Sequence, residues 1–297
     1  MRRSLLFIPG NQPSMIQNGQ VLPADALIFD LEDSVAMADK DAARDLVASA
    51  LTSLDFGQRE RMVRINDLAS PLARQDLEAM VGAGADAILM PKVSGGESIR
   101  ALDAILTALE AKLGRPAGAT RILALIETAI GMEEIYQAAT ASPRLLALAL
   151  GAEDLAADLG CQRTREGQEI LYSRSRLVMA AKAAGLEAID TPFTDAHDLE
   201  GCLADSQLAV SLGFTGKLAI SPHHLAMIHQ AYTPSQEALD QALEILQAME
   251  EAGRHGRGVV SLRGRMIDLP VVKQAQRVLA LARAAGLLKG DSHDQSR

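Results

Sequence analysis

The sequence predicts an α/β protein that folds as a (β/α)8 TIM barrel with a C-terminal helical extension. Two observations support this prediction. Eight short apolar runs alternate with longer segments of helical periodicity between residues 4 and 220. Strands alternating with helices produce a parallel sheet, and eight such units match a closed barrel, which typically needs about 250 residues. Polar residues, many of them acidic, follow the C-terminal ends of these runs, where a barrel places its active site.

The expected strands are short and apolar, and they cover residues 4–8, 26–30, 61–65, 87–90, 121–126, 145–150, 187–190 and 217–220. Segments between them, such as 70–82, 97–113 and 166–184, carry apolar residues at helical spacing. Glycine-containing sequences at 82–86 and 184–187 are typical of helix C-caps that lead into a strand. A doubly wound open sheet is the competing fold. It has fewer strands as a rule and often a Gly-rich first turn, and this sequence lacks Gly-x-Gly-x-x-Gly.

The pattern changes after the eighth run, where two helical patterns follow at 235–252 and 270–285, with a short expected strand at 259–262 between them. We therefore divide the chain into a barrel (1–232), a C-terminal helical extension (233–288) and a polar tail (289–297) that we expect to be disordered. The extension is too small to bury a rich core of its own. We expect it to pack on the barrel or to contribute to a neighbouring subunit.

Composition excludes several classes of function. The 297 residues include 29 basic and 38 acidic side chains, a net charge of −9, with no basic blocks and only 3% aromatic residues, so nucleic-acid binding is not expected. No apolar run approaches the roughly 20 residues of a membrane span. The N-terminal apolar core, Leu5 to Ile8, is too short for a signal peptide. We expect a cytoplasmic protein in which Cys161 and Cys202 are reduced thiols.

Five carboxylates follow the predicted strands at Asp30, Glu32, Asp33, Glu127 and Asp154. Strand ends are surface positions and would be polar in any case, but the whole set favours an active site. Like charges that converge on one barrel mouth repel each other unless a cation joins them. Oxygen ligands without His or Cys indicate Mg²⁺, with Mn²⁺ as the alternative. Glu127 and Asp154 follow adjacent strands and are the expected metal ligands.

Two basic residues lie at the same strand ends. Arg64 and Lys92 provide positive charge for an anionic substrate, and Arg64 is suited to bind a carboxylate or an enolate oxygen through two hydrogen bonds. A Schiff base on Lys92 is the competing interpretation, but it leaves the carboxylates without a role. Spacing alone therefore indicates metal-assisted chemistry on a small oxo acid, without saying which reaction.

Serine and histidine residues give weaker signals. Ser4 and Ser221 have no His and Asp partners in an order that indicates a serine hydrolase. His223, His224 and His229 resemble a metal cluster at first sight. Their spacing on a predicted helix does not allow chelation, so we expect solvated or capping roles for them.

Eight segments, in this order, are similar to the motifs of one family: Arg-Ser-Leu-Leu-Phe-Ile-Pro-Gly (3–10), Asp-Leu-Glu-Asp-Ser-Val (30–35), Val-Arg-Ile-Asn (63–66), Pro-Lys (91–92), Ile-Glu-Thr-Ala (126–129), Gly-Ala-Glu-Asp-Leu (151–155), Gly-Phe-Thr-Gly-Lys (213–217) and Met-Ile-Asp-Leu-Pro (266–270). On these motifs the chain resembles the citrate lyase β-subunit-like family, the acyl-CoA lyases of the HpcH/HpaI aldolase superfamily. Each motif alone is weak, but their common order makes the resemblance specific. It extends from Arg3 to about Ala285.

The resemblance implies a TIM barrel that assembles as a homotrimer or as a hexamer. It implies Mg²⁺ held by Glu127 and Asp154, and Arg64 in contact with the carbonyl or carboxylate oxygens of the substrate. Asp268 matches the family's acid/base residue, which reaches the site of a neighbouring subunit. The expected catalytic residues are Arg64, Asp268 and Asp33. The expected substrate-binding residues are Arg64, Lys92, Pro91, Glu32, Asp30, Ala152 and Glu153.

The family implies a reversible carbon–carbon lyase that acts on a 3-hydroxy-3-carboxyacyl-CoA thioester. Citramalyl-CoA would give acetyl-CoA and pyruvate, and malyl-CoA would give acetyl-CoA and glyoxylate. The alternatives are a citrate lyase β subunit acting on a citryl thioester of an acyl-carrier protein or CoA, a malyl-CoA thioesterase or malate synthase-like enzyme, and a CoA-independent 2-oxo acid aldolase. One departure stands out, because Ser221 replaces the family's usual His after the eighth strand.

Overall fold

The computed structural model describes residues 2–254 and 259–288. The tail that we expect to be disordered (289–297) therefore lies outside the described residues. The chain divides into two compact units, Arg2–His229 and a second that begins at Gln230. Within the described residues, no helix has the length and apolar character needed to cross a membrane.

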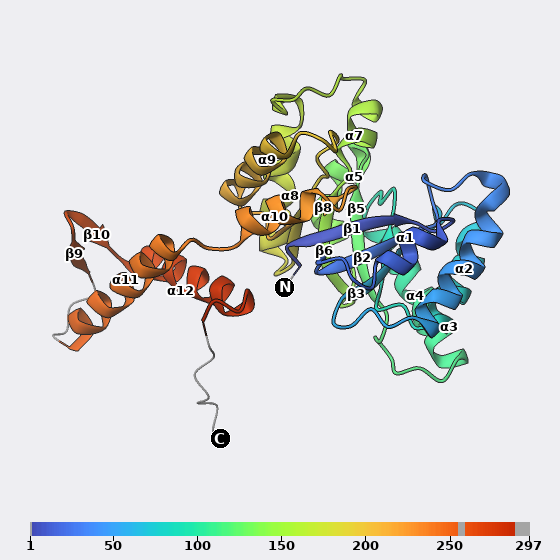
Figure 1. Cartoon of the computed structure of the whole chain (residues 1–297), viewed down its shortest axis with the longest axis horizontal. Helices are drawn as coiled ribbons and strands as arrows, with labels where there is room; N and C mark the ends of the chain where they lie inside the picture. The colour runs from blue at the N-terminus through green and yellow to red at the C-terminus, as the bar shows by residue number, and fades with distance from the viewer. Residues whose placement is uncertain (1, 255–258, 289–297) are drawn as a thin grey trace. The chain divides into compact units, whose positions relative to one another are not determined.

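The first unit is a closed barrel of eight parallel strands, which confirms the predicted fold (Figure 1). The strands are β1 (Ser4–Pro9), β2 (Ala26–Asp30), β3 (Glu60–Arg64), β4 (Ala87–Met90), β5 (Arg121–Ile126), β6 (Leu145–Leu150), β7 (Glu187–Asp190) and β8 (Gly216–Ala219). Each strand pairs with the next in the sequence, and β1 pairs with β8 to close the ring. All C-terminal strand ends therefore open on one mouth.

Helices connect the strands, as the helical periodicity predicted. They are α1 (Pro13–Asn18), α2 (Lys40–Ser53), α3 (Leu72–Ala83), α4 (Gly96–Lys112), α5 (Ala129–Glu133), α6 (Ile135–Ala139), α7 (Ala152–Leu159), α8 (Leu171–Ala183), α9 (Leu199–Leu212) and α10 (His224–Tyr232), with 3-10 turns η1 (Met37–Asp39) and η2 (Gln168–Ile170). The predicted C-cap at 82–86 is observed, because α3 ends at Gly84 with a left-handed φ of 85°. The segment 166–184 gives a shorter helix than expected, since its first part forms η2.

The barrel interior is a packed apolar core. Its members are Leu5, Ala26, Ile28, Met62, Ala87, Leu89, Leu123, Leu125, Ala147, Ala149, Ile189 and Leu218. They alternate along the strands with residues that face the helices, and small alanines lie among the larger side chains so that the layers interdigitate. This packed interior supports the strand ends on which the site is built.

The second unit has its own small core. Helices α11 (Gln236–Arg254) and α12 (Leu269–Ala284) pack through Leu239, Ala242, Ala275, Leu279 and Ala282. Between them, β9 (Val260–Leu262) and β10 (Arg265–Ile267) form an antiparallel hairpin. The sequence pattern predicted the first of these strands and missed the second. Asp268 caps α12, since its Oδ1 accepts a hydrogen bond from the backbone N–H of Val271 at 3.3 Å.

Candidate active site

A cavity of about 300 Å³ lies at the C-terminal ends of the strands. The predicted site residues that line it are Asp30, Arg64, Glu127, Ala152, Glu153 and Asp154. They come from the ends of β2, β3 and β5 and from the first turn of α7, which follows β6. The barrel thus brings together residues that are up to 124 positions apart in the sequence (154 − 30 = 124).

Arg64 is held by Asp30 through two parallel hydrogen bonds. Its Nε donates to one Asp30 oxygen at 2.7 Å and a terminal nitrogen donates to the other at 2.6 Å. The two residues are partners in the register of β2 and β3, which places them side by side. Burial would raise the pKa of Asp30, but the hydrogen bonds and charge of Arg64 outweigh it and hold that pKa below its usual range. The pair is therefore a fixed ion pair at the cavity wall.

Glu32 and Asp33 extend this charge network. Glu32 lies 3.1 Å from Arg64 and 3.4 Å from the ammonium of Lys92, and Asp33 lies 3.6 Å from Arg64. Burial raises the pKa of Glu32, and the charges of Asp33 and Asp30 add to that effect against the two cations. Asp33 is more than half exposed. The loop after β2 that carries Glu32 and Asp33, which we call the acidic loop, thus contains one buried and one solvent-accessible carboxylate beside the guanidinium of Arg64.

Glu127 is the most strongly perturbed carboxyl group of the site. It is 1% exposed, and its Oε1 accepts a hydrogen bond from the backbone N–H of Lys92 at 2.8 Å. Burial, with the negative charges of Asp154 and Glu32, raises the pKa of Glu127 to about 8. Gly151 makes room for it, because a Cβ at that position would lie 2.6 Å from a Glu127 oxygen. The carboxylate is held where no matched cation neutralises it.

Lys92 reaches Glu127 through a strained backbone. Its φ of 51° is left-handed, a conformation that is uncommon outside glycine and that concentrates at functional sites. This conformation directs the Lys92 amide at Glu127 while the side chain, 45% exposed, extends toward Glu32. The sequence indicated a role for the charged side chain of Lys92. The structure shows that its backbone N–H also contacts Glu127.

Glu127 and Asp154 fit a divalent cation. Asp154 lies exposed in the first turn of α7, and it lines the same cavity as Glu127. The described residues contain no group of three His, Cys, Asp or Glu side chains that could enclose a metal ion. Mg²⁺ does not need one, since it commonly takes one or two protein carboxylates and completes its shell with water and substrate oxygens. Two repelling carboxylates, one of them desolvated, suit such an ion.

The remaining predicted site residues have other surroundings. The backbone N–H of Ala152 donates to the hydroxyl of Thr191 at 3.2 Å, so it is already engaged within the protein. Pro91 is buried and directly follows β4. The cavity lining does not include Pro91, Glu32, Asp33 or Lys92. Asp268 belongs to the second unit. Thr191 lines the cavity and was not predicted, although its position directly after β7 meets the strand-end rule.

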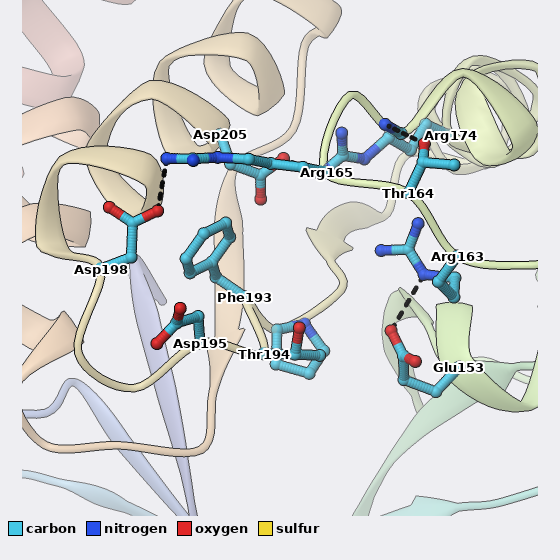
Figure 2. Close-up of a pocket in the computed structure, with 12 residues that line it drawn as sticks. Glu153, Arg163, Thr164, Arg165, Arg174, Phe193, Thr194, Asp195, Asp198 and Asp205 are labelled. Carbon is cyan, nitrogen blue, oxygen red and sulfur yellow. Dashed lines mark hydrogen bonds and ion pairs between the residues drawn. The ribbon is translucent and has the colours of Figure 1, made fainter.

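A second cavity, of about 270 Å³, shares Glu153 and Pro192 with the first. Figure 2 shows Arg163 and Arg165 of this cavity directed at carboxylates. Arg163 donates to Glu153 at 2.9 Å, and Arg165 donates to Asp198 at 2.5 Å. Arg163 also pairs with Glu169. These guanidinium groups are neutralised within the protein, so this cavity is not a strongly cationic surface.

The serine and histidine residues behave differently from expectation in two places. Ser4 does have a histidine partner, because its Oγ lies 2.8 Å from Nε2 of His229, which is 3.8 Å from Asp25. This group is not a hydrolase site, since Ser4 is completely buried at the start of β1, the end opposite the mouth. We expected a solvated or a capping role for His224, and the first of these is wrong. Its ring is 1% exposed and lies 3.1 Å from the carbonyl of Asp195.

Comparison with known proteins agrees with this geometry. Residues 3–222 match the family model described as HpcH/HpaI aldolase/citrate lyase. The citrate lyase subunit beta of Leuconostoc mesenteroides subsp. cremoris is 42% identical over 293 residues, which is 99% of this chain and 97% of that protein. The mitochondrial citramalyl-CoA lyase of Mus musculus is 36% identical over 293 residues, covering 95% of this chain and 86% of the relative.

A solved structure supports the same assignment. Protein CitE from Mycobacterium tuberculosis, in complex with magnesium, acetoacetate and coenzyme A, superposes with a TM-score of 0.80 at 31% identity. The match covers 95% of this chain and 98% of that one. The family model spans well over half of the chain, and both relatives exceed 30% identity across nearly all of it. The chain therefore belongs to the HpcH/HpaI aldolase/citrate lyase family, and it is a carbon–carbon lyase.

Proposed function

We propose that this protein is a Mg²⁺-dependent lyase that cleaves a 3-hydroxy-3-carboxyacyl-CoA thioester, with citramalyl-CoA as the first candidate substrate and malyl-CoA as the second. One observation carries the proposal: the cavity pairs a fixed guanidinium, Arg64, with the buried carboxylate Glu127 and its neighbour Asp154. An anion-binding group beside a divalent-cation site suits a substrate with adjacent carboxylate and hydroxyl oxygens. The citramalyl-CoA lyase relative and the CoA-bound structure support this substrate class.

Glu127 and Asp154 would hold the Mg²⁺ ion, which, when bound, supplies Lewis-acid polarisation of the hydroxy-acid oxygens. The protein's own residues then have separate tasks. We assign to Asp33, exposed beside Arg64, the removal of the substrate hydroxyl proton. Arg64, held rigid by Asp30, stabilises the negative charge that develops on the thioester oxygen as the carbon–carbon bond breaks.

The enolate carbon must then receive a proton. We assign this step to Asp268, delivered by the C-terminal extension of a neighbouring subunit in a homotrimer or hexamer. Asp268 lies at the junction of β10 and α12, where its role as N-cap fixes the backbone around it. Protonation releases acetyl-CoA and the 2-oxo acid. We further propose that the enzyme acts in the cytoplasm, where acyl-CoA esters are formed and used.

A second candidate function also has a specific observation behind it. The citrate lyase subunit beta of L. mesenteroides is more similar to this chain than the citramalyl-CoA lyase is, at 42% against 36% identity. In that case the substrate would be a citryl thioester carried by an acyl-carrier protein. The same residues would perform the cleavage, because the reacting carbons carry the same carboxylate and hydroxyl groups.

The test is to incubate the purified protein with Mg²⁺ and, in parallel, citramalyl-CoA, malyl-CoA and citryl-CoA, and to follow products by liquid chromatography. We expect acetyl-CoA and a 2-oxo acid from citramalyl-CoA, and loss of both with EDTA. R64A should lower kcat/KM by about 10³-fold, because it removes charge stabilisation of the transition state. R61A is the matched control, since Arg61 lies on the same strand but pairs with Asp86.

Other products in this assay would indicate other functions. Free CoA without acetyl-CoA would indicate a thioesterase. Cleavage of citryl-CoA alone would favour the citrate lyase subunit. No turnover of any of the three CoA thioesters by the wild-type protein would contradict the proposal. It would favour a CoA-independent aldolase or a citrate lyase subunit that acts only within its complex.

A further inference from the structure

Lys40 is a buried cation that the proposed chemistry does not use. It is the first residue of α2, it is 7% exposed, and its Nζ donates to the backbone carbonyls of Leu31 at 2.7 Å and Glu32 at 2.5 Å. Within the described residues, this ammonium group forms no ion pair with a carboxylate. It contacts instead the backbone of the acidic loop that carries Glu32 and Asp33.

Stability alone does not explain this lysine. Burying an ammonium group without a carboxylate partner costs free energy, and a methionine of similar length would avoid that cost. The first turn of a helix is also the end at which the helix dipole disfavours a cation. Burial lowers the pKa of Lys40, although the charges of Asp30, Glu32 and Asp33 oppose that effect. The ammonium group of Lys40 is therefore buried at a cost in free energy, in the first turn of α2.

Lys40 and Asp30 together hold the backbone of the acidic loop through hydrogen bonds. Asp30 accepts hydrogen bonds from the amides of Glu32 at 2.9 Å and Ser34 at 3.1 Å. Lys40 binds the carbonyls of Leu31 and Glu32. Glu32 is therefore held at both its amide and its carbonyl, and its side chain meets Arg64 and Lys92.

We propose that Lys40 is a positioning residue of the active site, which holds the acidic loop so that Glu32 and Asp33 face Arg64. It acts through the backbone of Leu31 and Glu32 and does not touch the substrate. Its kinetic consequences rest on the proposed function, because that function gives Arg64 and Asp33 their roles. A displacement of about 1 Å at such groups is enough to lower turnover by up to about 10²-fold.

The experiment compares K40M and K40R with L51A, a matched control that truncates a buried residue at the far end of the same helix. In K40M we expect hydrogen exchange of the Glu32 and Ser34 amides to accelerate by about tenfold or more. The reason is that the acidic loop loses its hydrogen bonds to Lys40 and opens locally. We expect kcat to fall at least about tenfold with KM within about threefold, since positioning affects the transition state more than binding. K40R retains paired donors and should recover at least about a third of kcat.

L51A should lower the thermal midpoint without changing loop exchange or kcat. Wild-type exchange and kcat in K40M, or the same changes in L51A, would overturn the role of Lys40. If K40M does not fold, K40Q replaces it with the same expected changes, and wild-type values in K40Q count against the proposal. If the wild-type protein cleaves no thioester, the proposed function fails, while the exchange data still decide whether Lys40 holds the loop.

Discussion

Two buried carboxyl groups at the cavity have opposite pKa shifts, and the difference assigns their tasks. Asp30 has Arg64 as a matched cation, so its pKa lies below the usual range and it is a permanent anion. Glu127 has only an amide hydrogen bond and distant cations, so burial raises its pKa to about 8. The first carboxylate anchors a side chain, whereas the second is suited to accept a cation.

The raised pKa of Glu127 predicts pH-dependent Mg²⁺ binding. Below pH 8 the group is largely protonated in the metal-free protein and must release its proton to bind the ion. We expect the affinity for Mg²⁺ to rise as the pH increases from 6 to 8, by up to about tenfold per unit, and to level off above pH 8. Isothermal titration calorimetry at pH 6, 7, 8 and 9 measures this directly.

Two variants make that titration specific. E127Q should bind Mg²⁺ weakly and without the pH dependence. E133Q, a substitution of an exposed glutamate on α5, should titrate like the wild type. An affinity that is flat between pH 6 and 8 in the wild type would contradict the role of Glu127.

At the residue scale, the sequence predicted that several polar residues lie at one barrel mouth, but it did not predict their partners. Asp30, Arg64, Glu127 and Asp154 follow strands, and the strand-end rule located them at one mouth. The Asp30–Arg64 pair depends on the register of β2 against β3, and the Ser4–His229 contact joins residues 225 positions apart. Side-chain partners of this kind are set by tertiary packing, which no local pattern encodes. The sequence analysis gave Lys40 no role for the same reason, because its contacts with Leu31 and Glu32 are visible only in the folded structure.

At the scale of elements, a buried ion cluster joins β7, β8, α8 and α9. Lys217 of β8 donates to Asp190 and Asp205, each at 2.6 Å, and Arg174 of α8 donates to the same two carboxylates. Asp190 and Lys217 are register partners in the barrel. Asp190 ends β7 immediately before Thr191, so the cluster fixes the strand end that binds the Ala152 amide.

This cluster predicts a large effect of K217M on stability. The variant leaves the buried Asp190 and the partly buried Asp205 to share the single charge of Arg174. Breaking a buried ion pair in this way costs about 3–5 kcal/mol of unfolding free energy. Urea denaturation followed by circular dichroism measures the loss. K112M, on the exposed face of α4, is the control and should change stability by less than about 0.5 kcal/mol. A cost below about 1 kcal/mol for K217M would mean that the cluster contributes little.

The elements themselves were largely predictable because the strands are short, apolar and bounded by polar residues. The range 26–30 coincides with β2, whereas the expected strand 61–65 is shifted by one residue, since Ile65 is apolar but lies beyond the last paired position. The sequence did not predict strand β10, because three residues are too few to show a pattern of alternating apolar and polar side chains. Its pairing depends on a turn at Arg263 and Gly264, both of which have left-handed φ angles.

At the scale of the whole molecule, the proposed chemistry divides between the two units. Glu127, Asp154 and Arg64 belong to the barrel, and Asp268 belongs to the C-terminal unit. A catalytic group on an appended unit can serve its own chain or a neighbouring one. The C-terminal unit has only a small core, so packing against another subunit would give it additional buried apolar surface.

Subunit complementation separates these two cases. E127Q and D268N should each be inactive, because one lacks a proposed metal ligand and the other lacks the proposed proton donor. If Asp268 serves a neighbouring barrel, a D268N barrel receives an intact Asp268 from an adjacent E127Q subunit. Random mixing of equal amounts then makes about one site in four complete, so co-expression should restore about a quarter of wild-type activity.

Light scattering on the same samples must give a trimer or a hexamer. If Asp268 serves its own chain, every site in the mixture contains one of the two substitutions, and co-expression restores nothing. A mixture of R64A with E127Q is the control, because both substitutions lie in the barrel and no assembly combines two intact partners. Activity in the first mixture and none in the control would assign Asp268 to the neighbouring site, whereas a monomer or an inactive first mixture would contradict that assignment.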